Sequence, residues 1–333
     1  MESKKTILIT GSAGFVGAHL VQHVLTNTDW NIVGIDSFRH RGDSLRVSDS
    51  NRYKIFTHDL TAPISDRLIR KIGKIDYIIN MASESHVDRS ITHSVDFCEN
   101  NFKLIMTMLE YARKANPKAF IQISTDEVYG AALEGHNHKE WETILPSNPY
   151  SGSKASQEAM CYSYWRTFNV PVIITNTMNL FGEAQDSEKF IPMLINKINK
   201  GEVVTIHGDE ESIGSRYYLH ARNQADALLF ILNNTSPTLY KDTINELIIL
   251  DRYNIVGDIE INNLEMGQLI AKLLNKDLKY KLDSFHKTRP GHDRRYALDG
   301  TKLKELGWIS PLTFEDSLRR TVEWTLDNPE WLL

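Results

Sequence analysis

Short runs of β-branched and apolar residues recur along the chain, each bounded by polar or turn-forming residues. These runs predict strands at residues 6–10, 31–36, 53–57, 76–80, 120–124, 172–175 and 247–250. Apolar residues with helical spacing lie between or beside the runs, at residues 15–25, 102–112, 151–168 and 220–232. The alternation of strand and helix predicts an α/β fold with a doubly wound parallel sheet, the Rossmann arrangement.

The pattern becomes less regular after about Asn179, where glycines divide short segments. We expect a smaller α/β substrate domain that is interleaved with the first. The predicted dinucleotide-binding domain spans residues 1–178, with residues 216–255 returning to it. The substrate domain then comprises residues 179–215 and 256–333.

A glycine loop follows the first predicted strand and opens the first predicted helix. Its sequence is Gly11-Ser12-Ala13-Gly14-Phe15-Val16-Gly17, with the glycine spacing of the short-chain dehydrogenase variant of the dinucleotide fingerprint. Glycine permits the tight turn and lets the backbone approach a pyrophosphate, which meets the free N–H groups of the helix. The context predicts that Gly11, Gly14, Phe15, Val16 and Gly17 bind a dinucleotide.

An acidic residue, Asp36, ends the second predicted strand, where it can accept hydrogen bonds from the adenine ribose hydroxyls. A carboxylate at this position favours NAD over NADP. The basic cluster Arg39, His40 and Arg41 follows closely and offers the alternative of a 2′-phosphate site, which the charge of Asp36 opposes.

Composition favours a small-molecule partner. The 333 residues are 41% hydrophobic and 24% charged, which is ordinary for a globular protein. The net charge is −5 without a long basic block, so we expect neither nucleic acid nor a membrane as a partner. Cys98 and Cys161 lack metal-ligand or redox spacing, and the chain shows no signal segment or apolar stretch of membrane-spanning length. We therefore expect reduced thiols and a cytoplasmic location.

The candidate chemistry combines a Tyr/Lys pair with two carboxylates. Tyr150 and Lys154 are four residues apart on a predicted helix, so their side chains share a face, and an ammonium beside a phenol favours the phenolate. Alone, this pair is a weak motif. Thr125, Asp126 and Glu127 leave the end of the fifth predicted strand, where a doubly wound sheet binds ligands. Paired carboxylates can divide acid and base roles, which elimination of water requires.

These residues resemble the dTDP-glucose 4,6-dehydratase family and its UDP- and CDP-sugar relatives, which are extended short-chain dehydrogenases. The resemblance spans most of the chain and is carried by residues 82–90, 125–130, 148–151, 189–192 and 289–297. Related 4-epimerases share the glycine loop and the Tyr/Lys pair but carry small residues at the positions of Asp126 and Glu127. UDP-glucuronate decarboxylases keep the Glu but usually not the Asp.

The resemblance implies a role for each catalytic residue. Tyr150, supported by Lys154, takes the proton of the C4 hydroxyl while NAD⁺ takes the C4 hydride, and Thr125 bonds the same oxygen. The resulting ketone acidifies the C5 hydrogen, which Glu127 removes. Asp126 protonates the departing C6 hydroxyl, and the hydride returns to C6. The cofactor is therefore regenerated within each turnover.

The resemblance also implies binding residues for both ligands. The cofactor positions are Asp59 and Leu60 at the adenine, with Ala82, Ser83 and Asn101 at or behind the nicotinamide half. The positions for a nucleotide-sugar substrate are Ser85, Asn179, Lys189, Arg216, Arg289 and His292. Departures from the family pattern occur at Leu180, Phe181, Tyr217, Ser83, Leu104 and residues 37–43. The chemistry motifs are intact while positions on the substrate side vary, so the residues indicate a reaction class and not a particular nucleotide or hexose.

Three alternatives stay open at this point. An NDP-sugar epimerase or a 5,6-dehydratase would use the same fold, and a non-catalytic dinucleotide sensor would keep only the glycine loop. His136 and His138 lie in a polar loop, where the pattern H-x-H is usually solvated, so we expect no metal. The helices predicted at 102–112 and 151–168 resemble those that pair in the family's dimer, with Met106, Met108 and Tyr164 among the expected contacts. A homodimer is therefore expected.

Overall fold

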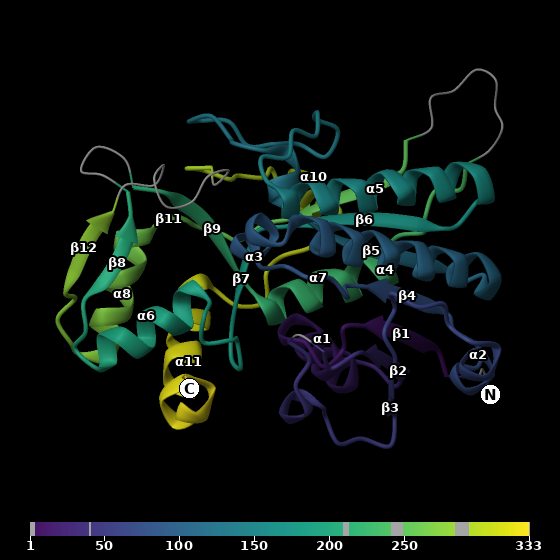
Figure 1. The fold of residues 1–333 in the computed structure, drawn as a ribbon, viewed down its shortest axis with the longest axis horizontal. Coiled ribbons are helices and arrows are strands. Elements are labelled where there is room, and N and C mark those ends of the chain that lie inside the picture. The colour runs from purple at the N-terminus through teal and green to yellow at the C-terminus, as the bar shows by residue number, and fades with distance from the viewer. Residues whose placement is uncertain (1–3, 40, 209–212, 241–248, 284–292, 333) are drawn as a thin grey trace.

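A parallel seven-stranded sheet forms the centre of the molecule (Figure 1). The computed structural model describes residues 4–39, 41–208, 213–240, 249–283 and 293–332. The strand order is β10-β6-β5-β4-β1-β2-β3, and neighbouring strands are all parallel. The strands are β1 Thr6–Thr10, β2 Asn31–Asp36, β3 Tyr53–Thr57, β4 Tyr77–Asn80, β5 Ala119–Thr125, β6 Val172–Thr177 and β10 Asp251–Ile255. The predicted doubly wound α/β fold is confirmed.

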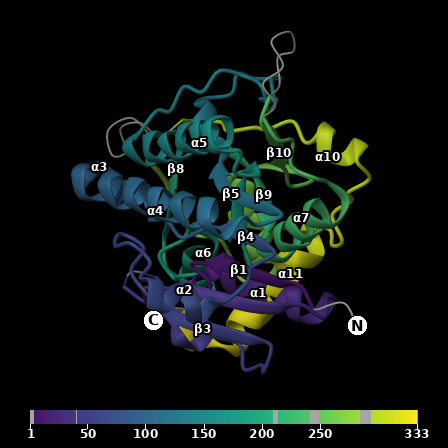
Figure 2. The ribbon, with the colours of Figure 1, turned by 90° about the vertical axis from the view of Figure 1, so that its right-hand side faces the viewer.

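Helices cover both faces of this sheet, as Figure 2 shows with the strands between two helical layers. One layer holds α1 Phe15–Asn27, α7 Ala221–Asn234 and α10 Thr301–Glu305. The other holds α2 Asp66–Ile72, α3 Val87–Thr92, α4 Ser94–Ala115 and α5 Pro149–Phe168. Each layer buries its own apolar cluster against the strands. Burial on both faces explains why the strands read as continuous apolar runs.

A smaller region packs beside the carboxyl ends of the large sheet (Figure 1). Its two sheets have the orders β11-β9-β7 and β12-β8. Its elements are β7 Asn179–Phe181, β8 Val204–His207, β9 Ser215–His220, β11 Glu260–Asn262, β12 Tyr280–Asp283, α6 Phe190–Asn199, α8 Asn263–Leu274 and α11 Phe314–Asp327. The domain boundaries remain a proposal: β10 joins the large sheet, whereas β9 pairs with β7 and β11.

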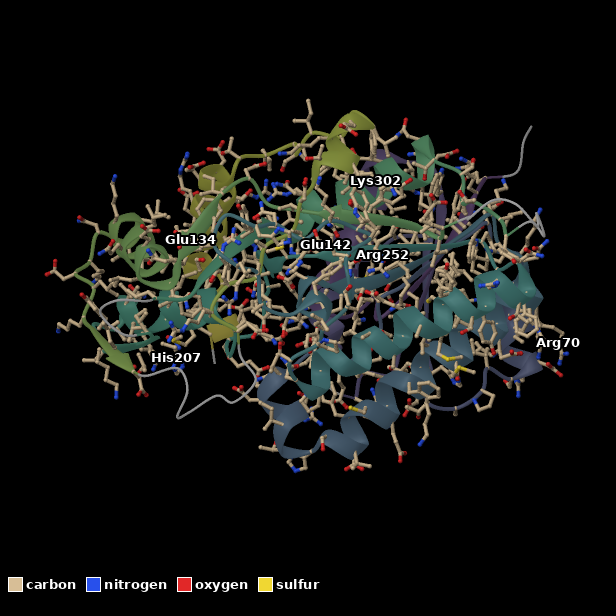
Figure 3. The ribbon with its side chains drawn as sticks, turned by 90° about the horizontal axis from the view of Figure 1, so that it is seen from above. Arg70, Glu134, Glu142, His207, Arg252 and Lys302 are labelled. Atoms are coloured by element: carbon tan, nitrogen blue, oxygen red, sulfur yellow. The ribbon has the colours of Figure 1, made fainter. Side chains whose placement is uncertain are left out.

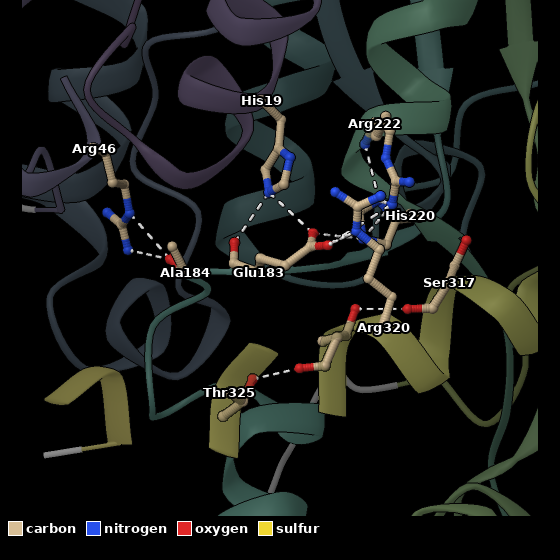
Figure 4. Close-up of polar contacts among 10 residues, drawn as sticks. His19, Arg46, Glu183, Ala184, His220, Arg222, Ser317, Arg320 and Thr325 are labelled. Carbon is tan, nitrogen blue, oxygen red and sulfur yellow. Dashed lines mark hydrogen bonds and ion pairs between the residues drawn. The ribbon is translucent and has the colours of Figure 1, made fainter. Parts of the chain in front are cut away.

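A polar cluster ties the smaller region to α1 (Figure 4). Glu183, which follows β7, lies 2.9 Å from Nε2 of His220, and its Oε1 accepts from Arg320 of α11 at 2.8 Å. The carbonyl oxygen of Glu183 lies 3.0 Å from Nε2 of His19 on α1. Through its carboxylate and its backbone carbonyl, Glu183 therefore joins three segments that are far apart in the sequence.

Two predicted elements differ from the observed ones. Of the strand predicted at 247–250, only residues 249 and 250 are described, and they are not in a strand; β10 begins at Asp251. Polar Arg252 and Asn254 interrupt the apolar pattern there, because both bind partners inside the fold. Helix α4 begins at Ser94, well before residue 102, because the buried residues of its first turns include Asn100 and Asn101, whose polar side chains hide the apolar spacing. Among the described residues, no helix has the length and apolar character that crossing a membrane requires.

Candidate active site

A cavity of about 680 Å³ opens at the carboxyl ends of the central strands. The chain runs outward from β1 to β3 in one direction and from β4 to β10 in the other. Ligands of doubly wound sheets bind where the order reverses in this way. The glycine loop lines one end of the cavity, and the predicted catalytic residues line the other. The structure thus brings the two motifs into one site.

The geometry of the glycine loop fits a dinucleotide pyrophosphate. Gly11 has φ +69°, a left-handed conformation that favours glycine. A Cβ on Gly17 would lie 2.1 Å from the carbonyl oxygen of Gly11, so the loop and the helix pack at a distance that only glycine permits. Helix α1 begins at Phe15 without a side-chain cap, which leaves its first N–H groups available to an anion.

Asp36 lies at the end of β2 beside this loop, buried and lining the cavity. Its Oδ2 accepts from the N–H of Ala13 at 3.0 Å, and its Oδ1 accepts from the N–H of Phe38 at 3.0 Å. A carboxylate has about four lone-pair positions, so acceptor capacity remains for two ribose hydroxyls. The carboxylate is therefore held in place by the backbone and still available to a ligand.

The arginines that follow Asp36 already have acidic partners. Arg39 pairs with Asp59 at 2.5 Å and donates to Oδ1 of Asn100 at 2.9 Å. Arg41 pairs with Glu188 across the cavity. Because these charges are balanced within the protein, they do not form a free site for a 2′-phosphate. His40 lies outside the described residues.

The remaining predicted cofactor residues divide into two groups. Those that line the cavity are Phe15, Val16, Asp59, Leu60, Ala82 and Ser83. Asn101 lies behind them: its Oδ1 accepts from the N–H of Glu84 at 2.8 Å, and its Nδ2 donates to Ser153 at 2.9 Å. It joins the segment after β4 to helix α5. Its place in cofactor binding stays a prediction.

The turn after β5 carries both predicted catalytic carboxylates, on the 3-10 helix η2 Asp126–Tyr129. Oδ1 of Asp126 accepts from the hydroxyl of Thr125 at 2.8 Å and from the N–H of Glu127 at 3.0 Å. Oδ2 of Asp126 is buried and has no hydrogen-bond partner among the residues that the structure describes. Asp126 lines the cavity, so this oxygen is the one that a ligand hydroxyl could engage.

Burial also makes the two carboxylates unusually basic. Burial raises the pKa of Asp126 to about 6. Burial and the neighbouring Asp126 raise the pKa of Glu127 to about 7. The pair can therefore hold a proton at neutral pH, as a site that must both donate and accept protons requires.

Tyr150 and Lys154 line the same cavity from the first turns of α5. The neighbouring side chain of Thr125 acts to lower the pKa of the phenol. Nζ of Lys154 donates to the carbonyl of Ile123 at 2.7 Å and to Oε1 of Gln157 at 2.8 Å, and burial lowers the pKa of Lys154 to about 8.

The expected effect of Lys154 on the phenol does not dominate in this structure. Burial, and next the carboxylate of Glu127, raise the pKa of Tyr150. The resting phenol is therefore protonated, because its surroundings are apolar and acidic. A positive charge brought into the cavity beside the phenol would lower its pKa. The role of Tyr150 as a base stays a prediction.

Asn148 is a residue whose role the sequence analysis missed. Its Oδ1 caps α5 by accepting from the N–H of Ser151 at 2.9 Å, and its Nδ2 donates to Oε2 of Glu127 at 3.1 Å. One amide therefore fixes the helix that carries Tyr150 relative to Glu127. The order Asn-Pro before Tyr150 is typical of a helix N-terminus and could have indicated this cap.

The predicted substrate residues are placed in three ways. Ser85, Asn179 and Lys189 line the cavity. Arg216 is buried and donates to the carbonyls of Ser215, Asp293 and Arg294 at 2.7 to 2.8 Å, so it holds the chain near the site and is not among the lining residues. Arg289 and His292 lie outside the described residues. These roles stay predictions.

His136 and His138 converge on one acidic side chain. Nε2 of His136 and Nδ1 of His138 lie 2.9 and 2.7 Å from Oε2 of Glu142. Hydrogen bonds to the carboxylate account for this arrangement. The expectation that the protein has no metal stays a prediction.

Comparison with known proteins identifies the family. A family model described as the NAD dependent epimerase/dehydratase family matches residues 7–245. The dTDP-glucose 4,6-dehydratase 1 of Escherichia coli (strain K12) is 37% identical over 355 residues, which cover 98% of this chain and 94% of that protein. This chain belongs to the NAD dependent epimerase/dehydratase family. The predicted family is confirmed.

Solved structures of this family extend the comparison. DesIV, a dTDP-glucose 4,6-dehydratase of Streptomyces venezuelae solved with NAD bound, has a TM-score of 0.87 at 29% identity, with 98% of both chains covered. A UDP-glucose 4-epimerase of Thermus thermophilus has a TM-score of 0.82 at 22% identity, over 96% of this chain and 98% of that chain, a likeness of fold alone. The predicted NAD cofactor is confirmed, and the predicted lyase activity is the one that the sequence relatives carry in their names.

Proposed function

We propose that this protein is an NAD-dependent sugar-nucleotide 4,6-dehydratase. It converts an NDP-hexose of the dTDP-glucose type to the 4-keto-6-deoxy sugar with loss of one water. The observation that carries the proposal is the adjacent pair of buried Asp126 and half-buried Glu127, which lines the same cavity as Tyr150. Epimerisation at C4 needs no second and third proton-transfer groups, whereas elimination of water needs both.

Thr125 and Tyr150 hold the C4 hydroxyl of the hexose in this proposal. Both side chains line the cavity, so one sugar hydroxyl could contact both. Tyr150 takes the proton of the C4 hydroxyl, and Lys154, one turn further along α5, supplies positive charge that favours the phenolate. The glycine loop and Asp36 would hold NAD, with the free N–H groups at the start of α1 suited to its pyrophosphate and the carboxylate suited to its ribose, and the bound cofactor would supply reversible hydride transfer.

Glu127 and Asp126 carry out the elimination. A ketone at C4 acidifies the C5 hydrogen, and Glu127 removes that proton. Asp126 donates a proton to the C6 oxygen through Oδ2, which has no hydrogen-bond partner in the described part of the chain. Since burial keeps the pKa values of both carboxyl groups near neutrality, each group can gain or lose a proton without a large free-energy cost.

The nucleotide end of the substrate is assigned to the side of the cavity formed by Asn179 and Lys189. Burial lowers the pKa of Lys189, and a diphosphate beside it would favour the charged ammonium. The names of the sequence relatives support a dTDP-hexose as substrate. Arg216, Arg289 and His292 remain proposed contacts.

We also propose that the protein is a homodimer that pairs through α4 and α5. The expected contacts Met108 and Tyr164 are buried within the chain, because both pack toward the sheet. The large apolar side chains that these helices expose are instead Val95, Phe102, Tyr162 and Phe168. A four-helix arrangement would cover them. The free thiols of Cys98 and Cys161 support a cytoplasmic location.

Product analysis tests the proposed function. The purified protein is incubated with dTDP-, UDP-, CDP- and GDP-hexoses without added oxidant, and the molecular mass of each product is measured by mass spectrometry. We expect one substrate to lose a single water and become a 4-keto-6-deoxy sugar. A product of unchanged mass that is a C4 epimer would replace the dehydratase proposal with the epimerase alternative.

A further inference from the structure

A buried carboxylate lies one helical turn beyond Lys154. The side chain of Glu158 is only 2% exposed, and it is not among the residues that line the cavity. Removing a carboxylate from water is costly unless hydrogen bonds and an opposite charge compensate. The partners of Glu158 therefore indicate what this residue contributes.

Two partners bind the two oxygens of Glu158. Oε1 accepts from Nδ2 of Asn176 at 2.9 Å, and Oε2 accepts from the guanidinium of Arg252 at 2.7 Å. Asn176 lies on β6 and Arg252 on β10, so helix α5 is fastened to two neighbouring strands. Figure 3 labels Arg252 together with Lys302, whose Nζ donates to the carbonyl oxygen of Arg252 at 2.7 Å.

Both partners also hold the turn that carries Asp126 and Glu127. Nδ2 of Asn176 donates to the carbonyl of Thr125 at 3.0 Å, at the start of the turn. Arg252 donates to the hydroxyl of Tyr129 at 3.2 Å, at the end of the turn. The contacts at both ends of the turn thus converge on one carboxylate.

We propose that Glu158 and Arg252 are positioning residues, which fix the turn of Asp126 and Glu127 relative to helix α5 and its Tyr150 and Lys154. Neither residue touches the reacting atoms. The assignment rests on the proposed function, because elimination is the step that uses the carboxylates of the turn. C4 oxidation uses Tyr150, which is held by the Asn148 cap and by Ser90, and Thr125, which is the last residue of β5 and is held by its pairing with β6.

Arginine is specific to this arrangement. Its NH2 binds Glu158 while its NH1 binds Tyr129, so one planar group spans two partners. A lysine ammonium could keep the charge pair but would not reproduce the planar fork. A purely structural ion pair would require only the charge.

Three variants test the positioning role. Glu158→Gln removes the charge with little change in size. Tyr129→Phe removes only the hydroxyl and keeps the ring, which stacks on His138 at 5.3 Å, so it serves if Glu158→Gln does not fold. Asp76→Asn is the matched control, because Asp76 pairs with Lys118 and accepts from the N–H of Thr6 at the amino ends of β4 and β1, whereas the cavity lies at the carboxyl ends.

The first measurement is hydrogen exchange of the backbone amides in residues 126–130 of the purified holoenzyme, without substrate. We expect exchange at least about tenfold faster in Glu158→Gln than in the parent, and unchanged in Asp76→Asn. The second is a single turnover followed by the reduced-nicotinamide absorbance and by product mass. We expect oxidation to slow less than about threefold and elimination at least about tenfold, because small displacements of catalytic groups are costly. In Tyr129→Phe we expect the amide exchange of the turn to become faster and elimination to become slower, each by a smaller factor than in Glu158→Gln.

The proposal is overturned if Glu158→Gln folds and keeps the parental ratio of elimination to oxidation. It is equally overturned if amide exchange in the turn matches that of Asp76→Asn. Should the parent protein fail to dehydrate any nucleotide hexose, the proposed function is wrong, and the exchange measurement still decides whether Glu158 orders the turn.

Discussion

Asp126→Asn separates elimination from the preceding oxidation with little disturbance of the fold. Oδ1 of Asp126 accepts from the hydroxyl of Thr125 and the N–H of Glu127, and an asparagine Oδ1 can accept both bonds. The amide nitrogen of the asparagine takes the place of Oδ2, for which the described residues provide no hydrogen-bond partner. The variant should therefore fold, with a loss of stability of about 1–3 kcal/mol for the buried amide donors.

The cost to the reaction should be much larger than the cost to the fold. An amide has the size of the acid but cannot give up a proton to the leaving C6 hydroxyl. Loss of such general acid help slows a step by about 10²–10⁴-fold. Oxidation at C4 uses Tyr150 and Thr125, so it should continue.

Stopped-flow absorbance of reduced nicotinamide and mass analysis of the product measure both steps on one sample. We expect Asp126→Asn to form reduced cofactor at nearly the parental rate and then to stall. Asp316→Asn, the same substitution on the exposed start of α11, should behave as the parent. Release of dehydrated sugar within about tenfold of the parental rate would refute the assignment of Asp126 as the acid.

The other predictions concern the base, the cofactor and the response to pH. Tyr150→Phe should abolish C4 oxidation while the protein still binds NAD, as cofactor fluorescence and activity would show; near-normal turnover would exclude Tyr150 as the base. Asp36→Asn should weaken NAD binding and reduce the preference for NAD over NADP, because no carboxylate is left to repel a 2′-phosphate. Titration calorimetry with both cofactors measures this preference, and an unchanged preference would mean that other residues select the cofactor. Burial, and next His220, lower the pKa of His19 to about 4 from 6.5, so the folded state favours neutral His19. The contribution of neutral His19 to the stability of the fold is therefore fully present above pH 6.5 and is lost as the pH falls toward 4. This shift of the pKa corresponds to up to about 3 kcal/mol of the free energy of unfolding. The midpoint of urea unfolding should fall as the pH is lowered from 6.5 to 4, and it should fall less in His19→Gln. A midpoint that does not depend on pH would contradict this prediction.

The strands and the glycine loop could be predicted because their signals are local. An apolar run such as residues 31–36 is buried on both faces, and this run matched β2 at both ends. Asp36 could be placed because it follows that strand directly. The beginning of α4 and all of β10 could not be placed, because their polar residues bind partners that only the fold brings near.

The two motifs of the site could be predicted, but the contacts that hold them could not. Tyr150 and Lys154 share a helix face by spacing alone. Glu158 lies at the next position of that spacing, yet its partner Arg252 is 94 residues away on β10. Nothing in the local pattern distinguishes this buried pair from two solvated charges. The protonated state of Tyr150 likewise follows from burial, which depends on the whole site.

One measurement tests the central claim most directly. The purified holoenzyme is incubated with dTDP-glucose in deuterated water, and the product is examined by mass spectrometry and proton NMR. The account predicts a 4-keto-6-deoxy sugar that has lost one water and carries solvent deuterium at C5, because Glu127 exchanges the proton that it removes. A sugar of unchanged mass with inverted C4, or a dehydrated product that retains the original C5 hydrogen, would contradict it.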